Sequence, residues 1–168
     1  QPGGVTQRIA YATLPMAYVG VLLAFVVLLR LRSLASLLAL IVVVKLCDIG
    51  AYTVGRLVGR HKMTPVLSPG KTWEGALGGI VFGCLGAWLA LVVLGPRISD
   101  MTAPSVSTWL RYGIIVSIAG ILGDLAESLL KRDLGHKDSS PWMPGFGGVL
   151  DIIDSILLAT PVAYALGP

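Results

Sequence analysis

Residues 34 to 58 read Leu34-Ala-Ser-Leu-Leu-Ala-Leu-Ile-Val-Val-Val-Lys-Leu-Cys-Asp-Ile-Gly-Ala-Tyr-Thr-Val-Gly-Arg-Leu-Val58, and this stretch decides the fold class. It exceeds the ~20 residues that a helix needs to cross the hydrocarbon core of a bilayer. A helix is expected because an isolated strand cannot satisfy its backbone hydrogen bonds in lipid. The stretch therefore predicts a transmembrane helix that carries Lys45 and Asp48 within it.

The rest of the chain repeats this apolar pattern. Of its 168 residues, 55% are hydrophobic and 13% are charged, and the mean hydropathy is +0.81, outside the range of soluble globular domains. Four further stretches are long or apolar enough to span a membrane: Tyr11–Leu29, Trp73–Leu94, Thr108–Leu130 and Gly148–Leu166. We predict an all-α fold, a polytopic integral membrane helix bundle of about five transmembrane helices, in a single domain over residues 1–168. Because the chain begins with Gln1 and not with Met, we expect it to be a piece of something longer.

Lysine and arginine are distributed unequally between the two sides of this bundle. One side receives Arg8, Arg56, Arg60, Lys62, Lys71, Lys131, Arg132 and Lys137, and the other receives Arg30, Arg32, Arg97 and Arg111. Short loops rich in these residues stay in the cytoplasm. The richer side is therefore predicted to be cytoplasmic, and it contains two hydrophilic loops, Ser68–Gly75 and Ser128–Asp138.

These two loops offer groups that bind phosphate. They contribute Lys71 with Thr72, and Lys131, Arg132 and Lys137. Lysine and arginine form charge-assisted bonds with phosphate oxygens, and the glycines of the following Pro144–Gly148 turn let backbone amides approach an anion. The simpler interpretation is that such loops only set the topology or contact anionic lipids. His61 and His136 are expected to be solvated.

Carboxylates inside the spans indicate a hard cation. Asp124, Glu127 and Lys131 recur at helical spacing, and Asp151 and Asp154 lie three residues apart at the start of the last span. An acid within a span costs at least about 2.5–3.5 kcal/mol on insertion scales and tends to line a cavity or to pair. Acids on two successive helices can converge on magnesium, which prefers oxygen ligands. We therefore predict that these acids bind a metal.

Each carboxylate also has a simpler interpretation. Glu127 can pair with Lys131 while Asp124 caps the helix or is solvated near the interface. The acids at the start of the last helix can interact with its dipole, which contributes about 0.3–1 kcal/mol for each. Lys45 and Asp48, three residues apart, can neutralise each other inside the bundle.

Together these motifs resemble those of the phosphatidate cytidylyltransferases, also called CDP-diacylglycerol synthases. The terminal signature of that family is matched in order and spacing by Ser128, Lys131, Arg132, Lys137, Asp138, Pro144, Gly145, Gly147, Gly148, Asp151 and Asp154. Its upstream motifs are similar at Asp48, Ala51, Tyr52, Gly55 and Arg56 and at Ser68, Pro69, Lys71, Thr72, Glu74 and Gly75. The signature regions are thus 44–75 and 124–155. The chain departs from the family pattern at Phe146, where the family has His, and at Ile152, where it has Arg.

The resemblance implies a nucleotidyltransferase of phospholipid biosynthesis that converts CTP and phosphatidic acid into CDP-diacylglycerol and pyrophosphate, with Mg²⁺ required. It implies metal binding by Asp124 and Asp151, supported by Asp154 and Asp48. It implies catalytic roles for Lys131, Arg132, Lys137, Asp138 and Lys71, and substrate binding by Ser68, Thr72, Glu74, Arg56, Ser128, Gly147 and Gly148. Family members are longer, with further apolar spans before this region, so residues 1–168 are expected to form the C-terminal catalytic part.

The expected partners are CTP, phosphatidic acid and membrane lipid, without nucleic acid, and a homodimer is compatible with such a bundle. The expected location is the bacterial inner (plasma) membrane, with the active site facing the cytoplasm. One alternative is a cation transporter in which Asp48, Asp124 and Asp151 line an ion path. It explains buried acids but not why basic and hydroxyl groups gather on one side. A non-catalytic structural membrane subunit is the other alternative, and its support is limited to Phe146 and Ile152.

Overall fold

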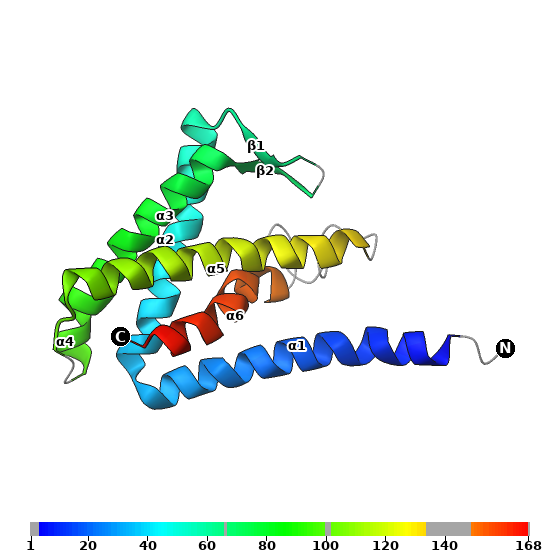
Figure 1. The fold of residues 1–168 in the computed structure, drawn as a ribbon, viewed down its shortest axis with the longest axis horizontal. Coiled ribbons are helices and arrows are strands. Elements are labelled where there is room, and N and C mark those ends of the chain that lie inside the picture. Colours follow the sequence, from blue (N-terminus) through cyan, green and yellow to red (C-terminus); the bar gives the residue numbers. More distant parts are fainter. Residues whose placement is uncertain (1–3, 66, 100–101, 134–148, 168) are drawn as a thin grey trace.

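The computed structural model describes residues 4–65, 67–99, 102–133 and 149–167. Its elements follow one another as α1 (Val5–Arg32), α2 (Leu34–Val58), β1 (Lys62–Thr64), β2 (Ser68–Thr72), α3 (Trp73–Ala87), the π-helix η1 (Trp88–Leu94), α4 (Gly95–Ile98), α5 (Val106–Asp133) and α6 (Val149–Leu166). Figure 1 shows α2 and α3 packed along each other, α5 beside α6, and α1 along the far side of α6. The prediction of an all-α membrane bundle is confirmed, with one small β-hairpin added.

Three helices of the described ranges are long and apolar enough to cross a membrane: Leu34–Val58, Trp73–Ile98 and Val106–Asp133. The last helix contributes a shorter apolar segment, Ile153–Leu166. The five predicted spans fall on α1, α2, α3 with η1, α5 and, from Val149 onward, α6, but their ends differ. For example, α1 begins already at Val5, and α3 continues through η1 and α4 to Ile98.

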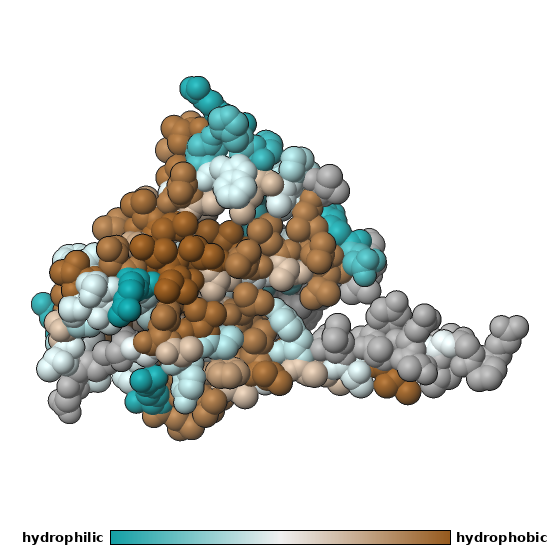
Figure 2. All heavy atoms as spheres, in the orientation of Figure 1, coloured by the Kyte–Doolittle hydropathy of each residue, from teal (hydrophilic) through white to brown (hydrophobic). Residues whose placement is uncertain are grey.

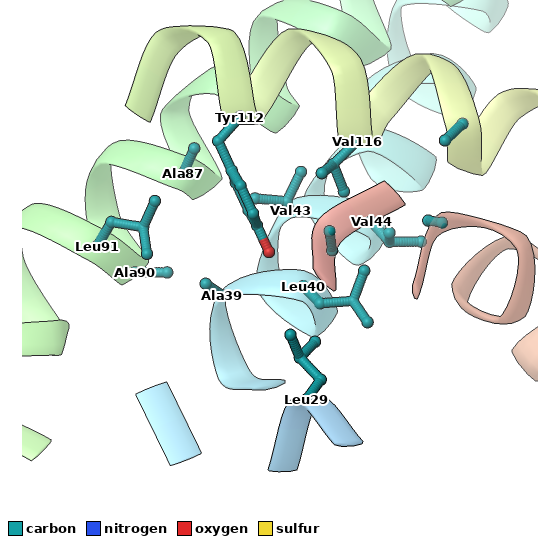
Figure 3. Packing of buried hydrophobic residues seen from close by; sticks show 13 residues of the cluster. Leu29, Ala39, Leu40, Val43, Val44, Ala87, Ala90, Leu91, Tyr112 and Val116 are labelled. Atoms are coloured by element: carbon teal, nitrogen blue, oxygen red, sulfur yellow. The ribbon is translucent and has the colours of Figure 1, made fainter. Parts of the chain in front are cut away.

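The core lies where α2, η1, α5 and α6 meet the end of α1. Tyr112 points from α5 toward α2, beside Val43 and above Leu40, and Leu29 closes the cluster from α1 (Figure 3). All four side chains are buried. In lipid this packing stabilises the bundle through close van der Waals contact, because neighbouring lipid tails are as apolar as the side chains.

Glycines bring α2 and α3 together. Gly75, Gly79, Gly83 and Gly86 are buried and recur every three or four residues along α3. A Cβ atom at Gly79 would lie only 3.0 Å from the carbonyl oxygen of Cys47 on α2. Small residues at this spacing let two helix backbones approach closely. This contact fixes the position of the hairpin that joins the two helices.

The opposite face of α3 is apolar and exposed. Leu77, Val81 and Leu85 are each more than half exposed, and they alternate with the glycines along the helix. Figure 2 shows apolar side chains over the middle of the bundle and hydrophilic ones at the end where the hairpin projects. A wide exposed apolar surface bounded by polar ends is what a lipid-facing bundle requires.

The hairpin was not expected from the sequence, which predicted a loop for Ser68–Gly75. β1 and β2 are antiparallel, with Lys62 opposite Thr72, Thr64 opposite Ser68 and an irregularity between these pairs. The Thr72 hydroxyl accepts a hydrogen bond of 3.1 Å from the amide of Gly75 and so caps α3. The predicted loop is therefore a strand that runs directly into a capped helix.

Candidate functional site

A cavity of about 730 Å³ lies between α2, the hairpin, α5 and α6. This volume falls within the ~300–1,000 Å³ range typical of small-molecule and cofactor sites. Residues that the sequence predicted for the site and that line this cavity are Asp48, Arg56, Ser68, Lys71, Thr72, Asp124 and Asp154. These residues come from four elements, α2, β2, α5 and α6, so the tertiary structure brings together side chains that are distant in the sequence.

Three acids meet beside this cavity. Oxygens of Asp124 and Glu127 on α5 and of Asp154 on α6 lie within 4.8 Å of one another. Glu127 is 5% exposed and Asp154 is 8% exposed, so neither charge is screened well by water. Carboxylates this close repel one another unless a cation lies between them, and hard divalent cations prefer such oxygen donors. This acidic triad fits a metal such as magnesium.

Glu127 was among the acids that the helical spacing predicted to converge on a metal, but the family resemblance gave it no metal-binding role. The sequence suggested that it pairs with Lys131, and that pair is present, with 2.8 Å between Lys131 Nζ and Glu127 Oε2. The ion pair and the contact with Asp154 coexist, because Glu127 faces both neighbours. The three-residue spacing from Asp124, which grouped the two acids in the sequence, places both on the face of α5 that meets Asp154.

Asp124 forms an ion pair with a lysine of the hairpin. Lys71 of β2 reaches Asp124 of α5, with 2.8 Å between its Nζ and Asp124 Oδ2. The suggestion that Asp124 is only a cap or a solvated group is therefore wrong. Ser128 adds a weak hydrogen bond, donated by its hydroxyl to Asp124 Oδ1 at 3.5 Å. The hairpin thus places the positively charged Lys71 side chain at the edge of the acidic triad.

Asp48 lies in the cavity wall on α2 and is paired differently. Lys45 Nζ donates to Asp48 Oδ2 at 3.1 Å, as the three-residue spacing predicted. One and two turns further on, Arg56 Nη1 donates to the hydroxyl of Tyr52 at 2.7 Å. The wall formed by α2 is therefore a line of polar groups that leads from Asp48 toward the hairpin.

Glu74 and His61 hold the base of the hairpin. Glu74 accepts hydrogen bonds from the amides of Arg60 and His61, and its Oε1 lies 2.5 Å from Nδ1 of the His61 ring. His61 is solvated as predicted, since its side chain is 80% exposed, but it also has a partner in Glu74, which was not expected from the sequence. The sequence could not show the contact, because the two residues meet only when β1 and β2 pair.

The remaining predicted residues lie elsewhere. Arg132 is exposed in the last turn of α5. Asp151 lies in the first turn of α6, where the structure describes its backbone but not its side chain. Lys137, Asp138, Gly147 and Gly148, together with His136 and Phe146, fall outside the described residues.

Comparison with known proteins gives consistent matches. A sequence profile of the cytidylyltransferase family matches residues 2–167. Over 94% of its length the chain is 38% identical to a phosphatidate cytidylyltransferase of Staphylococcus saprophyticus, 39% identical to that of Staphylococcus haemolyticus and 38% identical to that of Staphylococcus aureus. The chain spans 58% of the length of each of these relatives.

Proposed function

The chain belongs to the cytidylyltransferase family, and from this premise we propose that it is the catalytic part of a phosphatidate cytidylyltransferase. Such an enzyme transfers CMP from CTP to phosphatidic acid and releases pyrophosphate. The observation that carries the proposal is the acidic triad at the wall of a nucleotide-sized cavity, with Lys71 held 2.8 Å from one of its members. The chain spans 58% of the length of its relatives, which fits a part of such an enzyme, and the assignment to the C-terminal part stays a prediction.

The reaction makes few covalent demands on the protein. An oxygen of the lipid phosphate attacks the α-phosphorus of CTP, and the bond from that phosphorus to the pyrophosphate oxygen breaks. Catalysis then consists of positioning the two substrates and offsetting their negative charge. Side chains that carry fixed charge at the right place are sufficient for this chemistry.

Asp124, Glu127 and Asp154 are the residues that fit magnesium, with Asp151 as a further candidate from the sequence. Their oxygens are close enough to share one ion, and two of them are buried. When bound there, magnesium would supply positive charge to the phosphate oxygens and orient them. Asp48, which was also predicted to bind metal, forms an ion pair with Lys45. We therefore assign it a supporting role in the cavity wall and not a metal-binding one.

Cationic residues would hold the phosphates. The Lys71 ammonium lies at the edge of the acidic triad, and Lys131 lies two turns beyond Asp124 on the same helix, with its side chain 20% exposed. Each can donate charge-assisted hydrogen bonds to a phosphate bound between them. Arg132 and Lys137 extend the same basic segment in the sequence. Ser68 and Arg56, in the cavity wall, are proposed contacts to the nucleotide.

The membrane supplies one substrate and the cytoplasm the other. The cavity is lined both by membrane-spanning helices and by the hydrophilic hairpin, which fits a site that receives a lipid headgroup and a soluble nucleotide. The excess of lysine and arginine at the hairpin side supports a cytoplasmic orientation, and the staphylococcal relatives support the bacterial plasma membrane. A homodimer stays a prediction, to be tested by mass measurement in nanodiscs.

The alternative of a cation transporter has less support. In the described part of the chain, Lys71, Lys131 and Lys45 each pair with an acid at or beside the cavity. Fixed cations along an ion path would repel the transported ion. They suit a site that binds polyanionic substrates.

The test is turnover of CTP with phosphatidic acid in detergent, with magnesium present or chelated. We expect turnover to require both magnesium and the Asp124 carboxylate, so Asp124→Asn should abolish it while the protein remains folded. Asp133→Asn is the matched control, because Asp133 is an exposed acid at the end of the same helix. Turnover that persists in Asp124→Asn at limiting magnesium would remove Asp124 from the metal site, and magnesium-dependent ion flux without turnover would favour the transporter.

A further inference from the structure

Lys45 is a lysine near the middle of an apolar transmembrane helix. It lies on α2, within the span Leu34–Val58, where a charged side chain is costly unless it pairs or faces a cavity. It does both, because its side chain is 40% exposed, it lines the cavity, and its Nζ lies 3.1 Å from Asp48 Oδ2. The cost of a lysine at this depth calls for a role beyond filling space.

Asp48 is held from two helices at the same oxygen. Asp48 Oδ2 accepts a hydrogen bond from Lys45 and a longer one, 3.5 Å, from the hydroxyl of Ser155 on α6. The amide of Ser155 in turn donates to Asp154 Oδ1 at 2.5 Å. A chain of polar contacts therefore leads from Lys45 on α2 to Asp154, a member of the acidic triad.

Asp48 lines the same cavity as Asp124 and Asp154, and without Lys45 it would add an uncompensated carboxylate beside the acidic triad. Magnesium in phosphoryl-transfer sites is bound through a few carboxylates together with substrate phosphates, and it keeps coordination positions open for them. An additional unpaired carboxylate in the wall would draw the cation by its charge and compete with phosphate for it. The Lys45 ammonium neutralises the charge of Asp48 and takes up no coordination position on the metal.

We propose that Lys45 is a positioning residue that keeps Asp48 out of the metal's ligand set, so that the cation stays with the acidic triad and remains open to substrate phosphate. The proposal rests on the proposed function, since it concerns the same metal site. The proposal predicts that removing the lysine ammonium from the cavity tightens metal binding, although it impairs use of the nucleotide.

The experiment measures binding of Mn²⁺, through the loss of its free EPR signal, to the protein in lipid nanodiscs, with Mg²⁺ as competitor. Lys45→Met should bind Mn²⁺ about tenfold more tightly than wild type, because Asp48 is left as a free anion near the triad. The variant should also show a raised KM for CTP. Lys45→Arg retains the charge and should behave as wild type.

Two further variants separate this effect from general loss of positive charge. Lys62→Met removes the same charge from the exposed hairpin rim of the same cavity and should leave Mn²⁺ affinity within about twofold, since an exposed charge is screened. The double variant Lys45→Met/Asp48→Asn removes both charges and should return the affinity to that of wild type.

The outcomes distinguish failure of the proposed function from failure of the proposed role of Lys45. If the wild-type protein binds neither Mn²⁺ nor Mg²⁺, the proposed metal-dependent function fails. If wild type binds the ion and Lys45→Met leaves its affinity unchanged or weakens it, the proposed function stands and the role of Lys45 is overturned. The role is also overturned if tightening occurs but persists in the double variant, because Asp48 would then not be its cause.

Discussion

Gly75→Ala tests whether the close contact between α2 and α3 positions the site. A Cβ atom at Gly75 would lie 2.7 Å from the carbonyl oxygen of Ala51, 2.9 Å from Thr72 Oγ1 and 3.1 Å from Cα of Gly55. Two of these atoms belong to the backbone of α2, so no side-chain rotation relieves the clash. The helices must separate by several tenths of an ångström, or the cap on α3 must shift.

The expected cost follows from these contacts. Overpacking of this kind costs about 1–3 kcal/mol, and disturbing the Thr72 cap adds to it. Gly20→Ala on α1 is the matched control, because a Cβ there meets nothing within 4 Å and alanine favours a helix. Gly75→Ala should therefore be less stable than Gly20→Ala by about 1–3 kcal/mol.

Stability is measured by unfolding in mixed detergent micelles, and function by CTP turnover. Turnover should fall at least about tenfold in Gly75→Ala, since Lys71 and Thr72 directly precede the displaced helix and small misplacements in a site are costly. A Gly75→Ala protein as stable and as active as Gly20→Ala would refute the inference that this helix contact holds the hairpin in place.

Three other substitutions probe the charges. Glu127→Gln removes one predicted metal ligand, so the magnesium concentration for half-maximal turnover should rise about tenfold or more; an unchanged magnesium requirement would exclude Glu127 from the site. Lys71→Met removes a charge-assisted phosphate contact worth about 1.5–3 kcal/mol, so kcat/KM for CTP should fall at least about tenfold, and equal kinetics would limit Lys71 to a structural ion pair. Glu74→Ala releases the amide and ring of His61, so limited proteolysis should cut the hairpin faster while global stability changes little, because exposed pairs contribute little to it; an unchanged cleavage rate would mean that strand pairing alone holds the hairpin.

Contacts within one helix could be predicted from the sequence because helix geometry is regular. Residues three or four apart lie on one face, and this rule identified the Lys45–Asp48 and Glu127–Lys131 pairs, both of which form. It failed for His61, whose partner Glu74 is brought near by strand pairing. The hairpin itself was missed because β1 and β2 are very short, and the sequence shows no alternation that would mark them.

By itself the sequence determined that this chain is a helical membrane protein, because a helix satisfies the backbone hydrogen bonds of a single segment in lipid. It also determined which acids and bases lie on which helices, because helix spacing is local. Only the tertiary structure decided which of these groups meet. Asp124 and Glu127 join Asp154, and Lys71 joins Asp124, across elements that are distant in the chain. Those meetings depend on how closely α2 approaches α3 at its glycines and how α6 lies along α5, and such packing is the sum of many weak contacts that no local rule reports.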